Sequence, residues 1–217
     1  MATLGFEEVQ IAILNDQEQV VKVHKINAQV GGAVEAKISG LAPTTNTVYA
    51  SNVPFYVSAV GVSNPKLELN TADLTEEMIA DISGAKTNEN GITTLGADTV
   101  APYCAVIMKT KGLANDDIYI ALAKGKFGHP DGFDLKTGED KGQEADTTDG
   151  ALTGEFVARH SDGIVYAKGR TSTQGFTVSA FTQLLFPGWN GTTAEDQTST
   201  STTSTTTPTE TSDTTTA

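Results

Sequence analysis

Short runs of alternating apolar and polar residues, separated by turn-forming residues, constrain the fold of this chain more than any other feature. Val9, Ile11 and Ile13 alternate with Glu8, Gln10 and Ala12, which is the period of a strand with one buried face. Similar strand patterns recur along the chain. We predict them at 21–24, 34–38, 47–69 with breaks near Asn52 and at 63–65, 103–109, 118–123, 152–159, 164–168 and 176–186.

One segment has the period of a helix instead. Leu74, Met78 and Ile82 recur every four residues and so share one face, which we expect to be core. Asp73 is a suitable N-cap and Gly84 a suitable C-terminal stop, so the helix should run from about Leu74 to Ser83. The sequence therefore predicts a mainly β fold, a β-sandwich or partly open barrel with one short α-helix.

The composition changes sharply after Trp189. Residues 192–217 comprise 26 residues, of which 14 are Thr and 4 are Ser, and none is a large apolar residue. Such a segment cannot bury enough surface to offset the entropy lost on ordering. We therefore expect one β domain over residues 1–191, followed by a disordered Thr/Ser-rich C-terminal tail over 192–217.

Charge and cysteine content exclude several classes of protein. The formal charge is −13, of which −9 falls on residues 1–191. We therefore do not expect a protein that binds nucleic acid through its phosphates. A single Cys excludes a disulfide scaffold and a cysteine-based zinc finger. The longest apolar run, Tyr103–Met108, is far shorter than the ~18 residues of a membrane span. Residues 1–8 lack the features of a secretory signal, so we expect synthesis and use in a reducing cytoplasm.

No residue pattern in the sequence indicates catalysis, a cofactor or a metal. Cys104 lies in an apolar strand, where a buried inert thiol is expected rather than a nucleophile. The histidines, His24, His129 and His160, are too far apart in sequence to form a metal motif. We expect them at the surface or rim, with His24 pointing outward from a strand whose Val21 and Val23 point inward.

Three further motifs are read as incidental. His129-Pro130-Asp131 matches a tripeptide of chaperone J-domains, but it lies between strand-like segments rather than between long helices. The acidic stretch from Asp131 to Asp149 could bind calcium, but its spacing does not match an EF-hand, so a solvated loop is expected. Asn190-Gly191-Thr192 is a glycosylation sequon, which has no meaning without secretion.

Six sequence blocks, taken in order, resemble the major tail tube protein of long-tailed (siphovirus) phages that infect Gram-positive bacteria. The first two are an opening strand and a second strand; a long hairpin, a helix start and two later strands follow. The blocks are 5–12, 32–39, 48–52 with 57–61, 72–75, 124–127 and 152–159. The chain departs from the family pattern at the hairpin tip, where Ser51-Asn52 stands in place of the two acidic residues that we expect there.

The resemblance implies a virion structural protein rather than an enzyme. Six protomers would form a ring, and rings would stack into the tail tube that conducts the phage genome during ejection. Partners would be further copies, the tape-measure and other tail proteins, and transiently passing DNA, with no membrane. Assembly would occur in the cytoplasm of the bacterial host. Because acids outnumber bases, we expect a neutral or net negative bore that does not hold DNA. The sequence does not identify individual residues of the lumen or of the ring interfaces.

Two alternatives stay open at the level of sequence. A secreted or surface-attached β-sandwich adhesin would use the Thr-rich segment as a stalk. A glycan hydrolase would use two of the many carboxylates, which would have to lie roughly 5–9.5 Å apart.

The tail is expected to be dispensable for folding. Truncation after Gly191 should leave the melting temperature within a few degrees of the full-length value, because termini without apolar anchors add little stability. Thermal unfolding followed by circular dichroism measures this. Loss of soluble protein on truncation would contradict the prediction.

Overall fold

The computed structural model describes residues 3–43, 45–59, 61–130, 151–189 and 191. Within these residues it contains twelve strands and two helices. The strands are β1 (Thr3–Leu14), β2 (Val20–Ile26), β3 (Ala33–Ser39), β4 (Thr45–Ala50), β5 (Val53–Ala59), β6 (Lys66–Thr71), β7 (Lys86–Thr87), β8 (Thr93–Thr94), β9 (Tyr103–Gly112), β10 (Asp117–Phe127), β11 (Leu152–Phe156) and β12 (Tyr166–Arg170). The helices are α1 (Glu76–Ser83) and α2 (Val178–Leu185).

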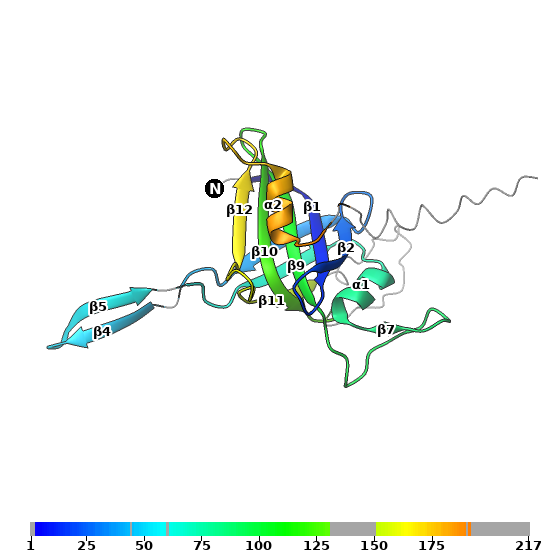
Figure 1. The fold of residues 1–217 in the computed structure, drawn as a ribbon, viewed down its shortest axis with the longest axis horizontal. Helices are drawn as coiled ribbons and strands as arrows, with labels where there is room; N and C mark the ends of the chain where they lie inside the picture. Colours follow the sequence, from blue (N-terminus) through cyan, green and yellow to red (C-terminus); the bar gives the residue numbers. More distant parts are fainter. Residues whose placement is uncertain (1–2, 44, 60, 131–150, 190, 192–217) are drawn as a thin grey trace, which may run out of the picture.

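Eight of the strands form one antiparallel sheet that folds over into two layers (Figure 1). Its order is β2-β1-β9-β10-β11-β6-β3. The eighth strand, β12, pairs with a different part of β10 from the part that pairs with β11. The sheet does not close into a barrel, because β2 and β3 end the path without pairing to each other. The expected mainly β fold, a sandwich or partly open barrel, is therefore confirmed.

The change of layer occurs within β10. Its first half, Ile118–Leu122, pairs with β12, and its last residues, Gly125–Phe127, pair with β11 instead. Gly125 lies opposite Phe156, and Gly154 lies opposite Phe127, so each glycine leaves room for the ring across the strand. The two rings pack edge to face with centroids 5.7 Å apart. Any Cβ on either glycine would overlap the opposite ring, so only glycine permits this close approach.

Two hydrophobic cores follow from this arrangement. The first lies between the layers and includes Val9, Ile11, Leu67 and Leu69. The second lies on the outer side of β1, β9 and β10, where α2 covers Ala12, Leu14, Val23, Ala105, Ile107, Ala121 and Ala123. Strand β1 thus has both faces buried.

Helix α2 replaces a predicted strand. The sequence at 176–186 was expected to extend a sheet, but Thr177 caps a helix, its Oγ1 accepting a hydrogen bond from the Ala180 N–H at 3.3 Å. Phe181 and Leu185, four residues apart, face the second core. The expectation of a single helix is therefore wrong, because an apolar run of this length fits either period.

Helix α1 confirms the predicted core face, with Leu74, Met78 and Ile82 all buried in the first core. Its start differs by two residues. The N-cap is Thr75, whose Oγ1 accepts a hydrogen bond from the Met78 N–H at 3.3 Å, rather than Asp73. The predicted stop at Gly84 is confirmed by its left-handed φ of 76°.

His24 is the clearest error in side-chain direction. Its side chain is only 2% exposed, whereas Val21 is 66% exposed. Both faces of β2 are covered at this point, since Val23 packs in the α2 core and His24 faces α1. His24 Nε2 lies 2.8 Å from Asp81 Oδ2 of α1, and burial lowers its pKa despite this carboxylate.

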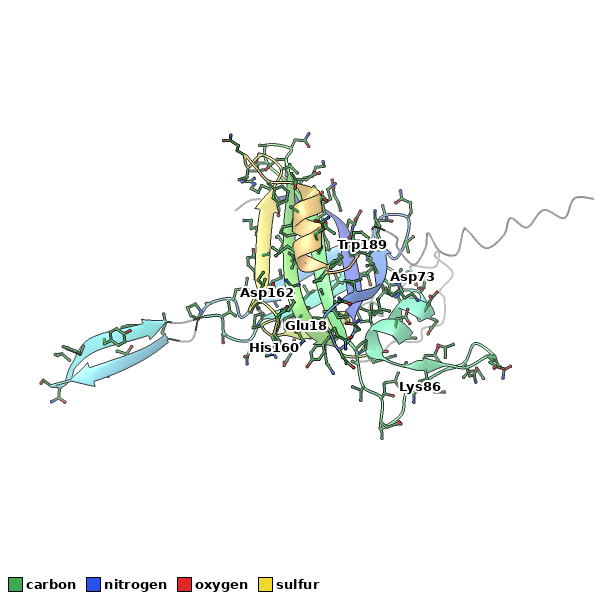
Figure 2. The ribbon with its side chains drawn as sticks, viewed as in Figure 1. Glu18, Asp73, Lys86, His160, Asp162 and Trp189 are labelled. Atoms are coloured by element: carbon green, nitrogen blue, oxygen red, sulfur yellow. The ribbon has the colours of Figure 1, made fainter. Side chains whose placement is uncertain are left out.

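The buried carboxylate of Glu18 connects three segments of the chain near the C-terminal end of α2 (Figure 2). Glu18, in the turn after β1, accepts hydrogen bonds from Lys124 Nζ at 2.8 Å and from the N–H groups of His160 and Ser161. The Lys124 hydrogen bond and these backbone donors lower the Glu18 pKa to about 2. The adjacent Arg159, itself buried, donates to the carbonyls of Leu184 and Leu185 and so caps the end of α2.

Met78→Ala is expected to lower the free energy of unfolding by ~2–5 kcal/mol, because it opens a cavity in the first core. Urea denaturation measures the change. Val21→Ala, at an exposed position, is the control and should stay within about 0.5 kcal/mol of the native chain. A Met78→Ala cost as small as the control would place this helix face outside the core.

Glu18→Gln is expected to lower the free energy of unfolding at pH 7 by about 2 kcal/mol, because it removes charge-assisted hydrogen bonds. The folded pKa of about 2 lies below the ordinary value of 4.5, so the stabilisation is present above pH 4.5 and is lost as the pH falls towards 2. The difference between variant and native chain should therefore shrink across that window. Glu89→Gln, at an exposed loop position, is the control; an equal and pH-independent effect of both would contradict the prediction.

Candidate assembly surface

The candidate reactive side chains do not converge on a site. Cys104 is buried as predicted, and burial raises its pKa to about 12, which leaves the thiol unreactive. His129 and His160 are exposed, as expected of surface residues. Among the residues that the structure describes, no group of three or more His, Cys, Asp or Glu side chains could hold a metal ion.

Several sequence motifs fall outside the described part of the chain. These are the acidic stretch from Asp131 to Asp149, the last residue of the His129-Pro130-Asp131 tripeptide, the sequon residues Asn190 and Thr192, and the tail at 192–217. Most of the segment 128–150 also lies there.

Neither of the two helices covers one outer face of the sheet. It belongs to β3, β6 and β11, whose outward side chains alternate with buried ones, as in the strict pattern of β6. Two ion pairs cross its strands: Lys37 Nζ lies 2.9 Å from Glu68 Oε2, and Lys66 Nζ lies 2.6 Å from Glu155 Oε1. With Glu35 added, this face carries three acids and two bases, and both bases are paired with carboxylates.

The hairpin β4–β5 is the most unusual surface of the protomer. Figure 1 shows it standing clear of both sheet layers. It exposes large apolar side chains, and Phe55 is 77% exposed. The others are Tyr49, Val53, Tyr56 and Val57.

The hairpin also contains no charge. Residues 38–65 include no Asp, Glu, Lys, Arg or His, in a chain of which 19% is charged. The tip is a tight turn, with left-handed φ values of 52° at Ser51 and 65° at Asn52, as a two-residue type I′ turn requires. The resemblance located this hairpin, but exposure of its aromatic residues was not anticipated. The uncharged stretch is the sequence signal that could have indicated it.

A second, smaller hairpin, β7–β8, projects from the other side of the protomer (Figure 1). It lies between α1 and β9, and nearby Ile92, Leu95 and Val100 are exposed. The protomer thus carries exposed apolar groups on two different projections.

A cavity of about 320 Å³ opens where β3 faces the start of β1. Its walls are mainly apolar, and Glu35 is its only charged lining residue. The lining is Thr3, Gly5, Phe6, Val34, Glu35, Ala36, Ile38, Met108, Thr110 and Ile120.

These surfaces suit association with other protein surfaces. An isolated two-stranded hairpin is marginally stable in water, and exposed apolar patches of this kind mark interaction sites. Unlike surfaces on opposite sides of a protomer make heterologous contacts, which generate rings or filaments. None of the helices in the described residues is long and apolar enough to cross a membrane.

Comparison with known proteins agrees with an assembling protein. No curated protein matches the sequence significantly. The sequence model of the phage tail tube protein family, in contrast, matches residues 1–194, which is most of the chain. The chain therefore belongs to the phage tail tube protein family and is a structural protein of the virion tail.

Proposed function

We propose that six copies of this chain form a ring and that the rings stack into a tail tube through which the phage genome is ejected. The exposed, uncharged β4–β5 hairpin carries this proposal, because it needs a partner surface that the single chain does not provide. The sequence blocks that resemble siphovirus tail tube proteins of Gram-positive hosts support the same assignment. A tape-measure protein would occupy the tube before DNA does, and assembly would take place in the host cytoplasm.

Closure into a ring would cover the free edges of the sheet. Among the described residues, strands β2 and β3 end the sheet path and each pairs on one side only; free strand edges of this kind promote uncontrolled pairing. A closed ring covers the lateral surfaces of every protomer. The axial surfaces stay available, so a heterologous contact between rings propagates into a tube.

The face of β3, β6 and β11 is our candidate for the bore wall. It is uncovered by helices, and its bases are already paired with carboxylates, so few are available to bind phosphate. Its excess of one acid matches the expectation of a neutral or net negative bore. DNA could then pass without salt-dependent binding of its phosphates to lysine or arginine side chains.

The opposite side of the protomer suits the exterior of the tube. There α2 covers the outer face of β9 and β10, and Trp189, which packs on Phe186 with ring centroids 5.8 Å apart, ends the folded domain beside it. A tail leaving from this side would stay out of the bore. We therefore take residues 1–191 as the tube-forming domain and 192–217 as an external extension, with no enzymatic role for either.

Electron microscopy of the purified full-length chain tests the assembly. Rings or stacked tubes with sixfold end views are expected. Monodisperse monomers at all protein concentrations would favour an adhesin or an enzyme on a β-sandwich instead.

Glu68→Lys, which also removes the ion-pair partner of Lys37, tests the bore wall. Tubes of this variant should bind short duplex DNA at physiological salt, with affinity that falls as salt rises, because the new lysine has phosphate within reach. Native tubes should bind none. Asp16→Lys, which adds the same charge in the turn between β1 and β2, is the control; equal DNA binding by both variants would place β6 away from the bore.

A further inference from the structure

The cavity between β1 and β3 and the β4–β5 hairpin are complementary surfaces within one chain. We propose that the cavity of one copy receives the β4–β5 hairpin of a neighbouring copy, with Phe55 as the side chain that enters it. The proposal rests on self-assembly of the chain into a tube, and it names the surface that the hairpin contacts.

The cavity exists because the sheet does not close. Strand β3 ends the sheet path and faces the start of β1 without pairing to it, which leaves a seam between them. Phe6, Ile38 and Met108 line the seam from β1, β3 and β9. Its volume of about 320 Å³ exceeds the roughly 150 Å³ of a cavity that binds benzene. One phenylalanine ring and part of a neighbouring side chain therefore fit.

The hairpin presents side chains that suit this cavity. Val53, Phe55 and Val57 alternate along β5, so they lie on one face of the strand. All three are exposed in the single chain. An aromatic anchor flanked by branched aliphatic residues is the usual composition of an energetically dominant contact between proteins.

Charge restricts which surfaces of two copies can meet. Each copy carries −13, so copies repel one another over most of their surface. The hairpin has no charged residue, and the cavity lining has only Glu35. Contact between the two therefore desolvates few charges, and no like-charged pair is brought together.

A second copy is a better occupant than the same copy. The hairpin follows β3 and precedes β6, and it extends away from the sheets rather than back across β3 (Figure 1). At the mouth of the cavity, Val34 is 59% exposed, so the hairpin of the same chain does not cover it. Every copy in a tube offers one hairpin and one cavity, as a repeating heterologous contact requires.

Cysteine crosslinking tests the contact directly. The variant that combines Val34→Cys with Phe55→Cys should give a ladder of disulfide-linked multimers on non-reducing gels after mild oxidation. Cys104 does not interfere, because it is buried. The matched control combines Val21→Cys with Phe55→Cys, since Val21 is similarly exposed but lies on β2, and it should give no ladder.

Other results overturn the contact. A disulfide within single chains would show that the hairpin occupies the cavity of its own copy. Equal ladders from both cysteine pairs, or no ladder under conditions in which the native chain forms tubes, would place the hairpin elsewhere, including on a different tail protein. The tube itself is judged separately. Tubes without a ladder overturn this contact alone, whereas a native chain that forms neither rings nor tubes overturns the proposed function as well.

Phe55→Asp provides a second test that does not depend on disulfide geometry. It should raise the critical concentration for tube formation at least about tenfold, because aspartate cannot replace the buried ring. Phe55→Leu should retain assembly, and the melting temperature of the protomer should be unchanged in both variants, since Phe55 lies outside both cores. Native-like assembly of Phe55→Asp would overturn the proposal.

Discussion

The contact between two glycines and two phenylalanines in β10 and β11 determines the layout of the protomer. Because Gly125 and Gly154 leave room for Phe156 and Phe127, β10 can leave one layer and enter the other without losing strand pairing. Both cores depend on this change of layer. One core fills the space between the layers, and the other lies outside the first layer beneath α2. The fold of the sheet brings β3 opposite the start of β1 without pairing the two strands, which leaves the seam between them.

The sequence predicted elements with one clear period and failed where two periods fit. Strand β6 follows its pattern, and so does the Leu74–Met78–Ile82 stripe, which begins just before α1, because each has one buried side. Helix α2 was mistaken for a strand, since the deciding feature is Thr177, a cap that a strand pattern does not reveal. His24 was misplaced because α1, which is distant in sequence, covers the second face of β2. The first error comes from a local cap that the strand pattern hides, and the second comes from tertiary packing, which a local pattern does not contain.

The candidate assembly surface was only partly predictable. The resemblance placed a long hairpin around Ser51 and Asn52, and the structure has one there. Exposure of Phe55 follows from where the hairpin projects, which depends on how β3 and β6 join the folded sheet. The cavity could not be predicted, because its walls come from four strands that are far apart in sequence. The balance of charge on the β3–β6–β11 face depends on strand register in the same way.

A hairpin that lacks a core of its own has a kinetic consequence. If copies stack into a tube as proposed, each hairpin loses conformational entropy when a neighbour covers it, so two free copies that meet must both lose it at once. A copy that joins the end of an existing stack meets a neighbour that is already ordered. Elongation is then easier than nucleation, as in other cooperative one-dimensional growth. In that assembly, free copies would accumulate without polymerising until some structure supplied the first ordered end, and that structure would set where and when tubes appear.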